Sequence, residues 1–177
     1  MSTVDTLPGV EFLGDATPFV GRIQEIITVI RLFDDFELRE IEMLARYMRC
    51  YRAAPGVEVI REGESGDFML LVLDGGVEVV KQDARGLPQV IATVGPGKTL
   101  GEMSMIDGEP RFSSCVALGT LEFALLDRAS LSHFIADEPR LGAKLLIELL
   151  MLLNQRLRSV SGQLMTCREM RHTRIRY

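Results

Sequence analysis

Leu-Gly-Glu-Met-Ser-Met-Ile-Asp-Gly-Glu-Pro-Arg-Phe-Ser-Ser-Cys-Val, residues 100–116, is the stretch from which the fold of this chain is best predicted. It opens with Gly101-Glu102, continues as a short helical segment and reverses at Asp107-Gly108. Asp-Gly followed by Pro110 favours a turn, because glycine tolerates a positive φ and proline fixes its own φ. From Phe112 on, β-branched and apolar residues become frequent, which predicts a strand.

The same stretch contains the residue types of an anion-binding site. Backbone N–H groups at the start of a short helix attract negative charge, and Gly101 allows a ligand to approach the backbone closely. Arg111 has a planar guanidinium that can hold two phosphate oxygens at once. Glu102 is an acceptor when ionised, so it suits sugar hydroxyls rather than the phosphate itself. A carboxylate alone beside a phosphate would be unfavourable, so Glu102 and Arg111 are expected to act together.

Gly101-Glu102 followed by Pro110-Arg111 resembles the phosphate-binding cassette of cyclic nucleotide-binding domains. These domains occur in the catabolite activator protein, in kinase regulatory subunits and in cyclic-nucleotide-gated channels. For this segment alone, the alternative is an ordinary connection between two strands with a solvated arginine. The resemblance implies that Arg111 holds the cyclic phosphate together with Gly101 and neighbouring backbone amides, and that Glu102 binds the ribose 2′-hydroxyl. Residues 100–116 are called the cassette below.

Composition narrows the class of protein. A chain of 177 residues with 47% hydrophobic residues fits one globular domain with extensions, and a net charge of −5 argues against a general nucleic-acid binder. The richest apolar run, Leu145 to Leu153, is interrupted by Glu148, so no membrane span is predicted, and the N-terminus lacks a secretory signature. Three distant cysteines indicate neither a disulfide framework nor a zinc site. A cytoplasmic location is therefore expected.

The N-terminal part is predicted to contain a leader and two helices. Residues 1–20 show little periodicity and are interpreted as a flexible leader. Apolar residues at helical spacing predict helices over 21–33 and 37–48. Pro55-Gly56 then predicts a turn into the first strand, which resembles the usual start of a cyclic nucleotide-binding domain.

Short apolar segments separated by glycine-rich turns follow. They predict strands over 57–61, 68–73, 77–81, 90–94, 112–118 and 121–126. The last two are expected to pair with each other across Gly119-Thr120. This pattern is typical of an all-β sandwich or barrel, and the resemblance implies a jelly roll. The expected fold is thus α+β: a β jelly roll (double-stranded β-helix) with N-terminal helices over 21–140 and a long C-terminal helix.

The C-terminal part, residues 141–177, is predicted to combine dimerisation and capping of the ligand. A helix over 128–137 ends at Pro139, and a long helix runs from about residue 141 to residue 170. Its first apolar stripe can pack on the sandwich, and the second has coiled-coil spacing, which favours a homodimer; a single wide face is the alternative. The first stripe comprises Leu145, Leu149 and Leu152, and the second comprises Leu146, Leu150, Leu153, Leu157, Val160, Leu164 and Cys167.

The basic tail, residues 168–177, has two interpretations. It could contact nucleic acid or an acidic partner, or it could be a favourable cationic helix end that frays. The chain ends before a helix-turn-helix domain could fit, so a stand-alone module is expected and nucleic acid is not an expected partner. The downstream protein cannot be named from the sequence.

The expected function is a non-enzymatic sensor of a cyclic nucleotide, cyclic AMP rather than cyclic GMP, that acts without a cofactor or metal. The alternative is a dimeric scaffold or interaction module that keeps the fold and has lost the ligand. Within the site, Ser113 and Ser114 are auxiliary donors, and alignment with the activator protein places Val160 and Ser161 near the purine. The predicted ligand-binding residues are Leu100, Gly101, Glu102, Met103, Arg111, Phe112, Ser113, Ser114, Val160 and Ser161.

Phe112 is the one clear departure from the family pattern, which has a small residue after the cassette arginine. A phenyl ring cannot donate a hydrogen bond to a phosphate. Two outcomes are open: the ring turns aside and leaves the backbone N–H usable, or it fills part of the pocket. The intact Gly101, Glu102 and Arg111 favour the first outcome, and the missing hydroxyl favours cyclic AMP over cyclic GMP.

Overall fold

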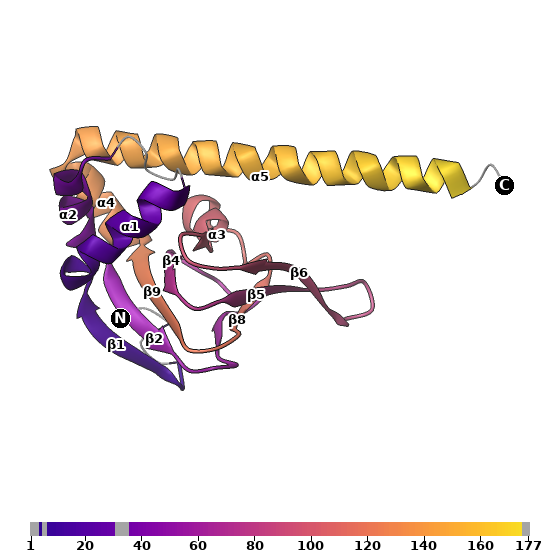
Figure 1. Ribbon diagram of the computed structural model, residues 1–177, viewed down its shortest axis with the longest axis horizontal. Coiled ribbons are helices and arrows are strands. Elements are labelled where there is room, and N and C mark those ends of the chain that lie inside the picture. The colour runs from indigo at the N-terminus through magenta and orange to yellow at the C-terminus, as the bar shows by residue number, and fades with distance from the viewer. Residues whose placement is uncertain (1–3, 5–6, 31–35, 175–177) are drawn as a thin grey trace.

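Two antiparallel β-sheets and a layer of helices make up the molecule (Figure 1). The computed structural model describes residue 4 and residues 7–30 and 36–174, without the side chains of residues 27–30 and 169–174. The end of the helix predicted over 21–33 and the last residues of the basic tail therefore lie outside the described residues. The α+β jelly roll with N-terminal helices and a long C-terminal helix, predicted from the sequence, is confirmed.

The strands fall into one five-stranded and one four-stranded sheet. The first has the order β1-β2-β9-β4-β7, made of Val10–Asp15, Arg49–Ala53, Leu121–Asp127, Phe68–Asp74 and Thr99–Leu100. The second has the order β3-β8-β5-β6, made of Glu58–Ile60, Ser114–Ala117, Val77–Gln82 and Pro88–Val94.

The helices cover the outer face of the five-stranded sheet (Figure 1). They are α1 (Val20–Ile30), preceded by a short 3₁₀ turn (Thr17–Phe19), then α2 (Leu38–Ala45), α4 (Arg128–Asp137) and α5 (Pro139–Arg174), while α3 (Glu102–Asp107) belongs to the cassette. This three-layer arrangement explains the uninterrupted apolar sequence of β4. Its residues Phe68, Leu70 and Val72 pack between the sheets, and Met69, Leu71 and Leu73 pack against the helices.

Three expectations about the strands need correction. Residues 10–15, expected in a flexible leader, form β1 and pair with β2 along the sheet edge. Residues 49–53 form β2. The sequence predicted a helix before this segment and a turn after it, and assigned no strand to the segment itself. The segments 112–118 and 121–126 do not pair with each other: β8 pairs with β3 and β5, whereas β9 pairs with β2 and β4. Both edges of each strand are occupied, so the link at Gly119-Thr120 crosses between sheets instead of closing a hairpin.

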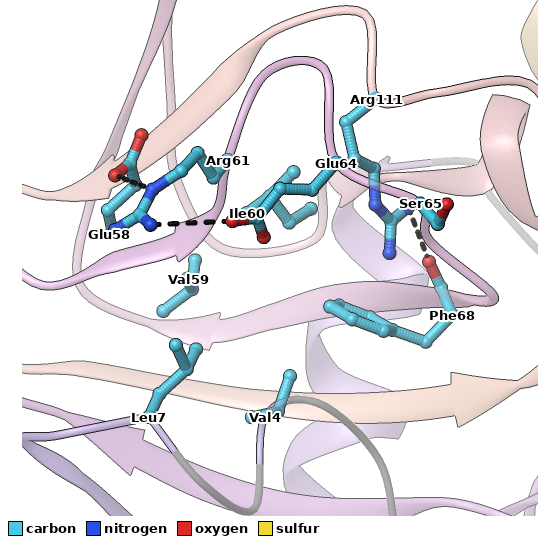
Figure 2. A pocket seen from close by; sticks show the side chains of 10 residues that line it. All are labelled: Val4, Leu7, Glu58, Val59, Ile60, Arg61, Glu64, Ser65, Phe68 and Arg111. Atoms are coloured by element: carbon cyan, nitrogen blue, oxygen red, sulfur yellow. Dashed lines mark hydrogen bonds and ion pairs between the residues drawn. The ribbon is translucent and has the colours of Figure 1, made fainter.

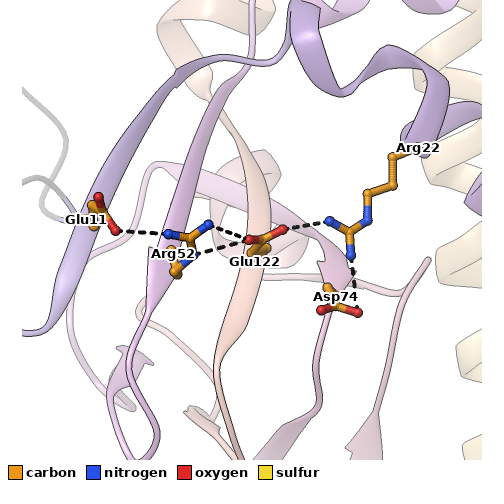
Figure 3. A network of polar contacts seen from close by, with 5 residues as sticks. All are labelled: Glu11, Arg22, Arg52, Asp74 and Glu122. Carbon is orange, nitrogen blue, oxygen red and sulfur yellow. Dashed lines mark hydrogen bonds and ion pairs between the residues drawn. The ribbon is translucent and has the colours of Figure 1, made fainter.

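A row of charged side chains fixes α1 to the five-stranded sheet (Figure 3). Arg22 of α1 lies 2.7 Å from a carboxylate oxygen of Glu122 on β9 and 3.2 Å from one of Asp74. Arg52 of β2 bridges Glu122, at 2.9 Å, and Glu11 of β1, at 3.3 Å. Glu122 thus binds two guanidinium groups, and α1 is connected through it to neighbouring strands. Exposed pairs of this kind contribute about 0–1 kcal/mol each, so they orient α1 more than they stabilise it.

The long helix α5 buries only one of its two apolar stripes. Leu145 and Leu149 are buried against the five-stranded sheet and its helices. On the neighbouring face, Leu150, Leu157 and Leu164 are 60%, 64% and 59% exposed. Figure 1 shows α5 running past the sheets, with the β5–β6 hairpin pointing in the same direction below it. The single wide face considered from the sequence therefore does not describe this helix, because its own domain leaves the second stripe uncovered.

Candidate ligand-binding site

The second residue of the cassette is a glycine that no other residue could replace without strain. Gly101 is the N-cap of α3 and has a φ of 80°, in the left-handed region. A Cβ atom there would lie 2.6 Å from Nη1 of Arg111 and 3.0 Å from the carbonyl oxygen of Phe68. Both contacts are too close for a carbon atom. The sequence feature Gly-Glu therefore has a steric cause: the backbone at residue 101 passes directly against the guanidinium of Arg111.

Arg111 is buried at the centre of this site. Its side chain is only 4% exposed, and its Nη1 donates hydrogen bonds of 2.8 Å to the carbonyl oxygens of Phe68 and Gly101. The guanidinium lies over the Phe68 ring, 4.2 Å from the ring centroid. Its Nη2 is buried and has no hydrogen-bond partner. Burial lowers the pKa of Arg111. The edge of the guanidinium that carries Nη2 thus remains able to bind an anion.

The loop between β3 and β4 holds the backbone of Arg111. The Arg111 N–H donates to the carbonyl oxygen of Glu64 at 2.8 Å, and the Gly63 N–H donates to the Arg111 carbonyl at 2.9 Å. Gly66 lies against the side chain: a Cβ atom there would be 1.8 Å from Nε of Arg111. Two glycines, Gly66 and Gly101, therefore leave the space that the guanidinium fills.

Glu102 is the second buried charged residue of the cassette. It is 1% exposed, its Oε1 accepts a hydrogen bond from Nη1 of Arg156, and its Oε2 is buried without a partner. Burial raises the pKa of Glu102, and the positive charges of Arg156 and Arg111 partly oppose this increase. One carboxylate oxygen is thus held by the protein, and the other is a free acceptor of the kind that a sugar hydroxyl could satisfy.

Arg156 of α5 is a site residue that the sequence interpretation did not assign. Its Nη1 donates to Glu102, and its Nη2 donates to the carbonyl oxygen of Thr99 at 2.5 Å. The available signal was periodicity: Arg156 continues the buried stripe of Leu149 and Leu152 by one further turn. At such a position, the apolar stem of an arginine can continue the buried stripe, and its charged end can reach a buried carboxylate.

The other predicted residues differ in where they lie. Leu100 is buried between the sheets, and Met103 is 47% exposed on α3. Val160 and Ser161 lie about one turn beyond Arg156 and are both exposed, so no cassette residue covers them. The structure therefore brings Leu100, Gly101, Glu102 and Arg111 together, while the two α5 residues lie apart from this cluster.

The serines after Arg111 are placed differently from the expected auxiliary donors. Ser114 accepts a hydrogen bond of 3.0 Å from the Glu62 N–H, at the β3 side of the sheet. The next residue, Cys115, is buried in the core between the sheets, so Ser114 points to the opposite face of β8. Ser113 is half-buried. The hydroxyl of Ser114 is thus used inside the β3–β8 pair, where it binds the backbone of Glu62.

The Phe112 ring is turned outward. It is 57% exposed, and the Lys81 ammonium lies 4.7 Å from the centroid of the ring. Lys81 in turn lies 2.5 Å from a carboxylate oxygen of Glu62. This arrangement corresponds to the first of the two outcomes considered from the sequence, in which the ring leaves the pocket interior.

A cavity of about 140 Å³ adjoins Arg111, which is one of its lining residues (Figure 2). Its walls include Val4, Leu7, Val59 and Phe68, together with the exposed pairs that Arg61 forms with glutamates. Glu102 does not line it, and ligand pockets usually have volumes above about 300 Å³. We therefore assign the candidate site to the cassette and the facing part of α5, not to this cavity.

Comparisons with known proteins agree with this geometry. The family model for the cyclic nucleotide-binding domain matches residues 52–138. A crystal structure of a cyclic nucleotide-binding domain from Methylobacillus flagellatus KT is 45% identical, with a TM-score of 0.80 over 86% of this chain and 85% of that chain. The protein therefore belongs to the cyclic nucleotide-binding domain family.

Two longer relatives are also similar. The CRP-like cAMP-activated global transcriptional regulator of Mycobacterium tuberculosis is 28% identical over 142 residues, which is 80% of this chain and 62% of the regulator. The catabolite activator protein structure from Thermus thermophilus is 29% identical, with a TM-score of 0.68 over 75% of this chain and 61% of that chain. The chain thus spans about three fifths of these two relatives.

Other chemistries find little support in the described part of the chain. No described helix has both the length and the apolar character needed to cross a bilayer. Within the same residues, no group of three histidine, cysteine or acidic side chains could hold a metal ion. Burial raises the pKa of the Cys115 thiol to about 12, so this thiol next to the site is protonated at neutral pH and is not a nucleophile.

The raised pKa of Glu102 predicts a specific pH dependence of stability. In the folded protein, Glu102 keeps its proton to a higher pH than in the unfolded chain, where the pKa is near 4.5. Its contribution to the free energy of unfolding is therefore fully present below pH 4.5 and decreases as the pH rises through the folded pKa. Glu102→Gln should gain stability relative to the parent as the pH rises from 4.5 through the folded pKa of Glu102.

Denaturant unfolding across this range measures the difference, with the exposed Glu109→Gln as a control that should show no such trend. If the parent instead gains stability over Glu102→Gln as the pH rises, the ion pair with Arg156 outweighs burial and the assignment is wrong.

Proposed function

We propose that this protein is a regulatory module that binds a cyclic purine mononucleotide and carries out no chemistry on it. The observation that carries the proposal is a pair of buried polar atoms without partners, Nη2 of Arg111 and Oε2 of Glu102, in one cassette. Native proteins rarely leave buried polar atoms unsatisfied, so such atoms point to a missing ligand. A donor and an acceptor on one cassette match a phosphate and a neighbouring sugar hydroxyl.

In this proposal each residue has a separate task. Arg111 holds the cyclic phosphate, with backbone amides at Gly101 completing the phosphate site. The free oxygen of Glu102 accepts a hydrogen bond from the ribose 2′-hydroxyl, while Arg156 fixes the other oxygen. In this family, a hydroxyl on the residue after the cassette arginine helps members that prefer guanine. Phe112 has no hydroxyl, so cyclic AMP is favoured over cyclic GMP. Val160 and Ser161 would contact the purine only after α5, or the same helix of a second copy of this chain, moves closer to the cassette.

The same proposal includes a homodimer and a cytoplasmic location. The exposed apolar stripe on α5 repeats in steps of four and three residues, which fits a parallel coiled coil with a second copy of this chain. The three cysteines of the chain are free thiols, which fits the reducing conditions of the cytoplasm. A dimeric scaffold without ligand is the alternative, and it is favoured by one observation: Arg111 already binds the carbonyl groups of Phe68 and Gly101.

Calorimetric titration of the protein with cyclic AMP and cyclic GMP separates the two functions. Saturable binding of one nucleotide to each chain supports the sensor. Absence of binding at millimolar nucleotide, in a folded protein, supports the scaffold.

Arg111→Ala tests the phosphate site directly. The change removes a charge-assisted pair from a buried position and should weaken nucleotide binding by about 2 to 4 kcal/mol. This corresponds to roughly a thirty- to thousandfold higher Kd in the titration. The control is Arg61→Ala, because Arg61 lies nearby but forms only exposed pairs, and it should leave the Kd nearly unchanged. Equal affinities of a folded Arg111→Ala variant and the parent would contradict the site.

Leu157→Glu tests the dimer. Leu157 lies at the middle of the exposed stripe from Leu146 to Leu164, so the change would bury an unpaired carboxylate between two helices and should split the dimer. Light scattering at micromolar concentration measures the mass. Gln155→Glu adds the same charge at an exposed position outside the stripe and should leave the dimer intact. A monomeric parent protein under these conditions would contradict the dimer itself.

Phe112→Ser tests the role of the ring. A hydroxyl at this position should add a hydrogen bond worth about 1 kcal/mol, which tightens binding several-fold and narrows the gap between cyclic AMP and cyclic GMP. Phe112→Ala is the matched control, because it removes the ring without adding a donor. Titrations with both nucleotides provide the comparison. If Phe112→Ser binds no better than the parent, residue 112 does not reach the ligand.

A further inference from the structure

The cassette helix α3 is held at both ends by arginine side chains. At its start, Nη1 of Arg111 donates to the Gly101 carbonyl oxygen. At its end, Arg128 donates from Nε to the Met105 carbonyl at 2.7 Å and from Nη2 to the Ser104 carbonyl at 2.8 Å. The Ser104 carbonyl also accepts from the N–H of the C-cap residue Gly108 at 3.0 Å, and a cation at this end interacts favourably with the helix dipole. Arg128 therefore acts as a C-terminal cap supplied by another part of the chain.

Arg128 is the first residue of α4, and its position there is unfavourable for α4 itself. A cation at a helix N-terminus opposes the dipole of that helix, so α4 gains nothing from the charge. The backbone around it is fixed. The Arg128 N–H donates to the Asp67 carbonyl at 2.7 Å, and the N-cap residue Asp127 binds the Ser130 N–H and the Arg49 guanidinium, each at 2.7 Å. The guanidinium thus links α3 to a firmly anchored helix start.

The link continues from α4 into α5. These helices pack so closely that a Cβ atom on Gly142 of α5 would lie 2.8 Å from the Cα of Ile135 on α4. The aromatic rings of Phe134 and Tyr47 and the hydrogen bond from the Tyr47 hydroxyl to Asp137 hold the other end of α4. A shift of α3 that kept both Arg128 bonds would therefore displace α4 and α5 together.

We propose that Arg128 is a positioning residue for ligand binding: it fixes the C-terminal end of α3 against α4 and so holds the cassette in its binding form. This inference rests on the proposed nucleotide-binding function. A phosphate that binds the free Nη2 of Arg111 leaves α3 held at its start by the contact of Glu102 with Arg156, and at its end by the two Arg128 bonds. Methionine at residue 128 would keep an unbranched apolar stem and lose the guanidinium, and with it both bonds.

The experiment compares Arg128→Met with Arg128→Lys and with Arg140→Met. Arg140 is exposed on α5 and forms no hydrogen bond with the residues that the structure describes, so its variant controls for loss of a surface charge. Two quantities are measured: the Kd for cyclic AMP, and hydrogen exchange of the α3 amides in the ligand-free protein. For Arg128→Met, we expect a Kd about three- to thirtyfold higher and faster exchange confined to the cassette.

Arg128→Lys can satisfy only one carbonyl group well, so its Kd should lie between those of the parent and Arg128→Met. This variant also serves if Arg128→Met does not fold. Equal Kd values and equal α3 exchange for the Arg128 and Arg140 variants would overturn the inference. Exchange that rises across the whole domain, with an unchanged Kd, would also overturn it, because it would show a purely stabilising cap. If the parent binds neither cyclic AMP nor cyclic GMP, the proposed function fails, and the exchange comparison alone decides whether Arg128 fixes α3.

Discussion

A buried guanidinium is the constraint on which this end of the molecule depends. Arg111 is almost inaccessible to water, and burying a cation is unfavourable unless hydrogen bonds replace its hydration. The surrounding chain is shaped to supply them. The carbonyl groups of Phe68 and Gly101 accept from one nitrogen, the Phe68 ring covers one face, and Gly66 leaves the space for the group. The unsatisfied nitrogen, Nη2, is the atom that we propose binds the anion, so the group that shapes the local fold is also the group proposed to bind the ligand.

Polar contacts also connect the site to the helices that cover the five-stranded sheet. Glu102 and Arg156 connect the cassette to α5, and Arg128 connects it to α4, so the helices are tied to the site at two points. Neither tie is made through the apolar core. Polar contacts of this kind can be exchanged with a ligand or with water at small net cost, whereas core packing changes only as a unit.

Local features of the fold could be predicted from the sequence, and long-range ones only in part. The cassette, the apolar strand β4 and the helix over 128–137 follow from turn residues and from periodicity, which neighbouring residues determine. The strand β1 was missed because its residues alternate poorly and gain order by pairing with β2, residues 49–53. The crossing at Gly119-Thr120 was predicted as a hairpin, since a short link contains no information on which edges of β8 and β9 are already occupied. For the site, Gly101, Glu102 and Arg111 were identified by their residue types and by their resemblance to the cassette of cyclic nucleotide-binding domains. Arg156 was not, because its contact with Glu102 spans 54 residues of sequence.

The length of α5 has a mechanical consequence. The part of the helix beyond Arg156 is about 27 Å long at 1.5 Å per residue, and Figure 1 shows it extending past the sheets. A rigid rod that pivots near Arg156 works as a lever: a tilt of about 10° moves its far end by about 5 Å, roughly the pitch of one helical turn. If the proposed ligand binds, a small adjustment of Arg156 would be magnified in this way at the far end of the helix. Such a lever needs no second domain of its own to produce a movement that another protein could detect.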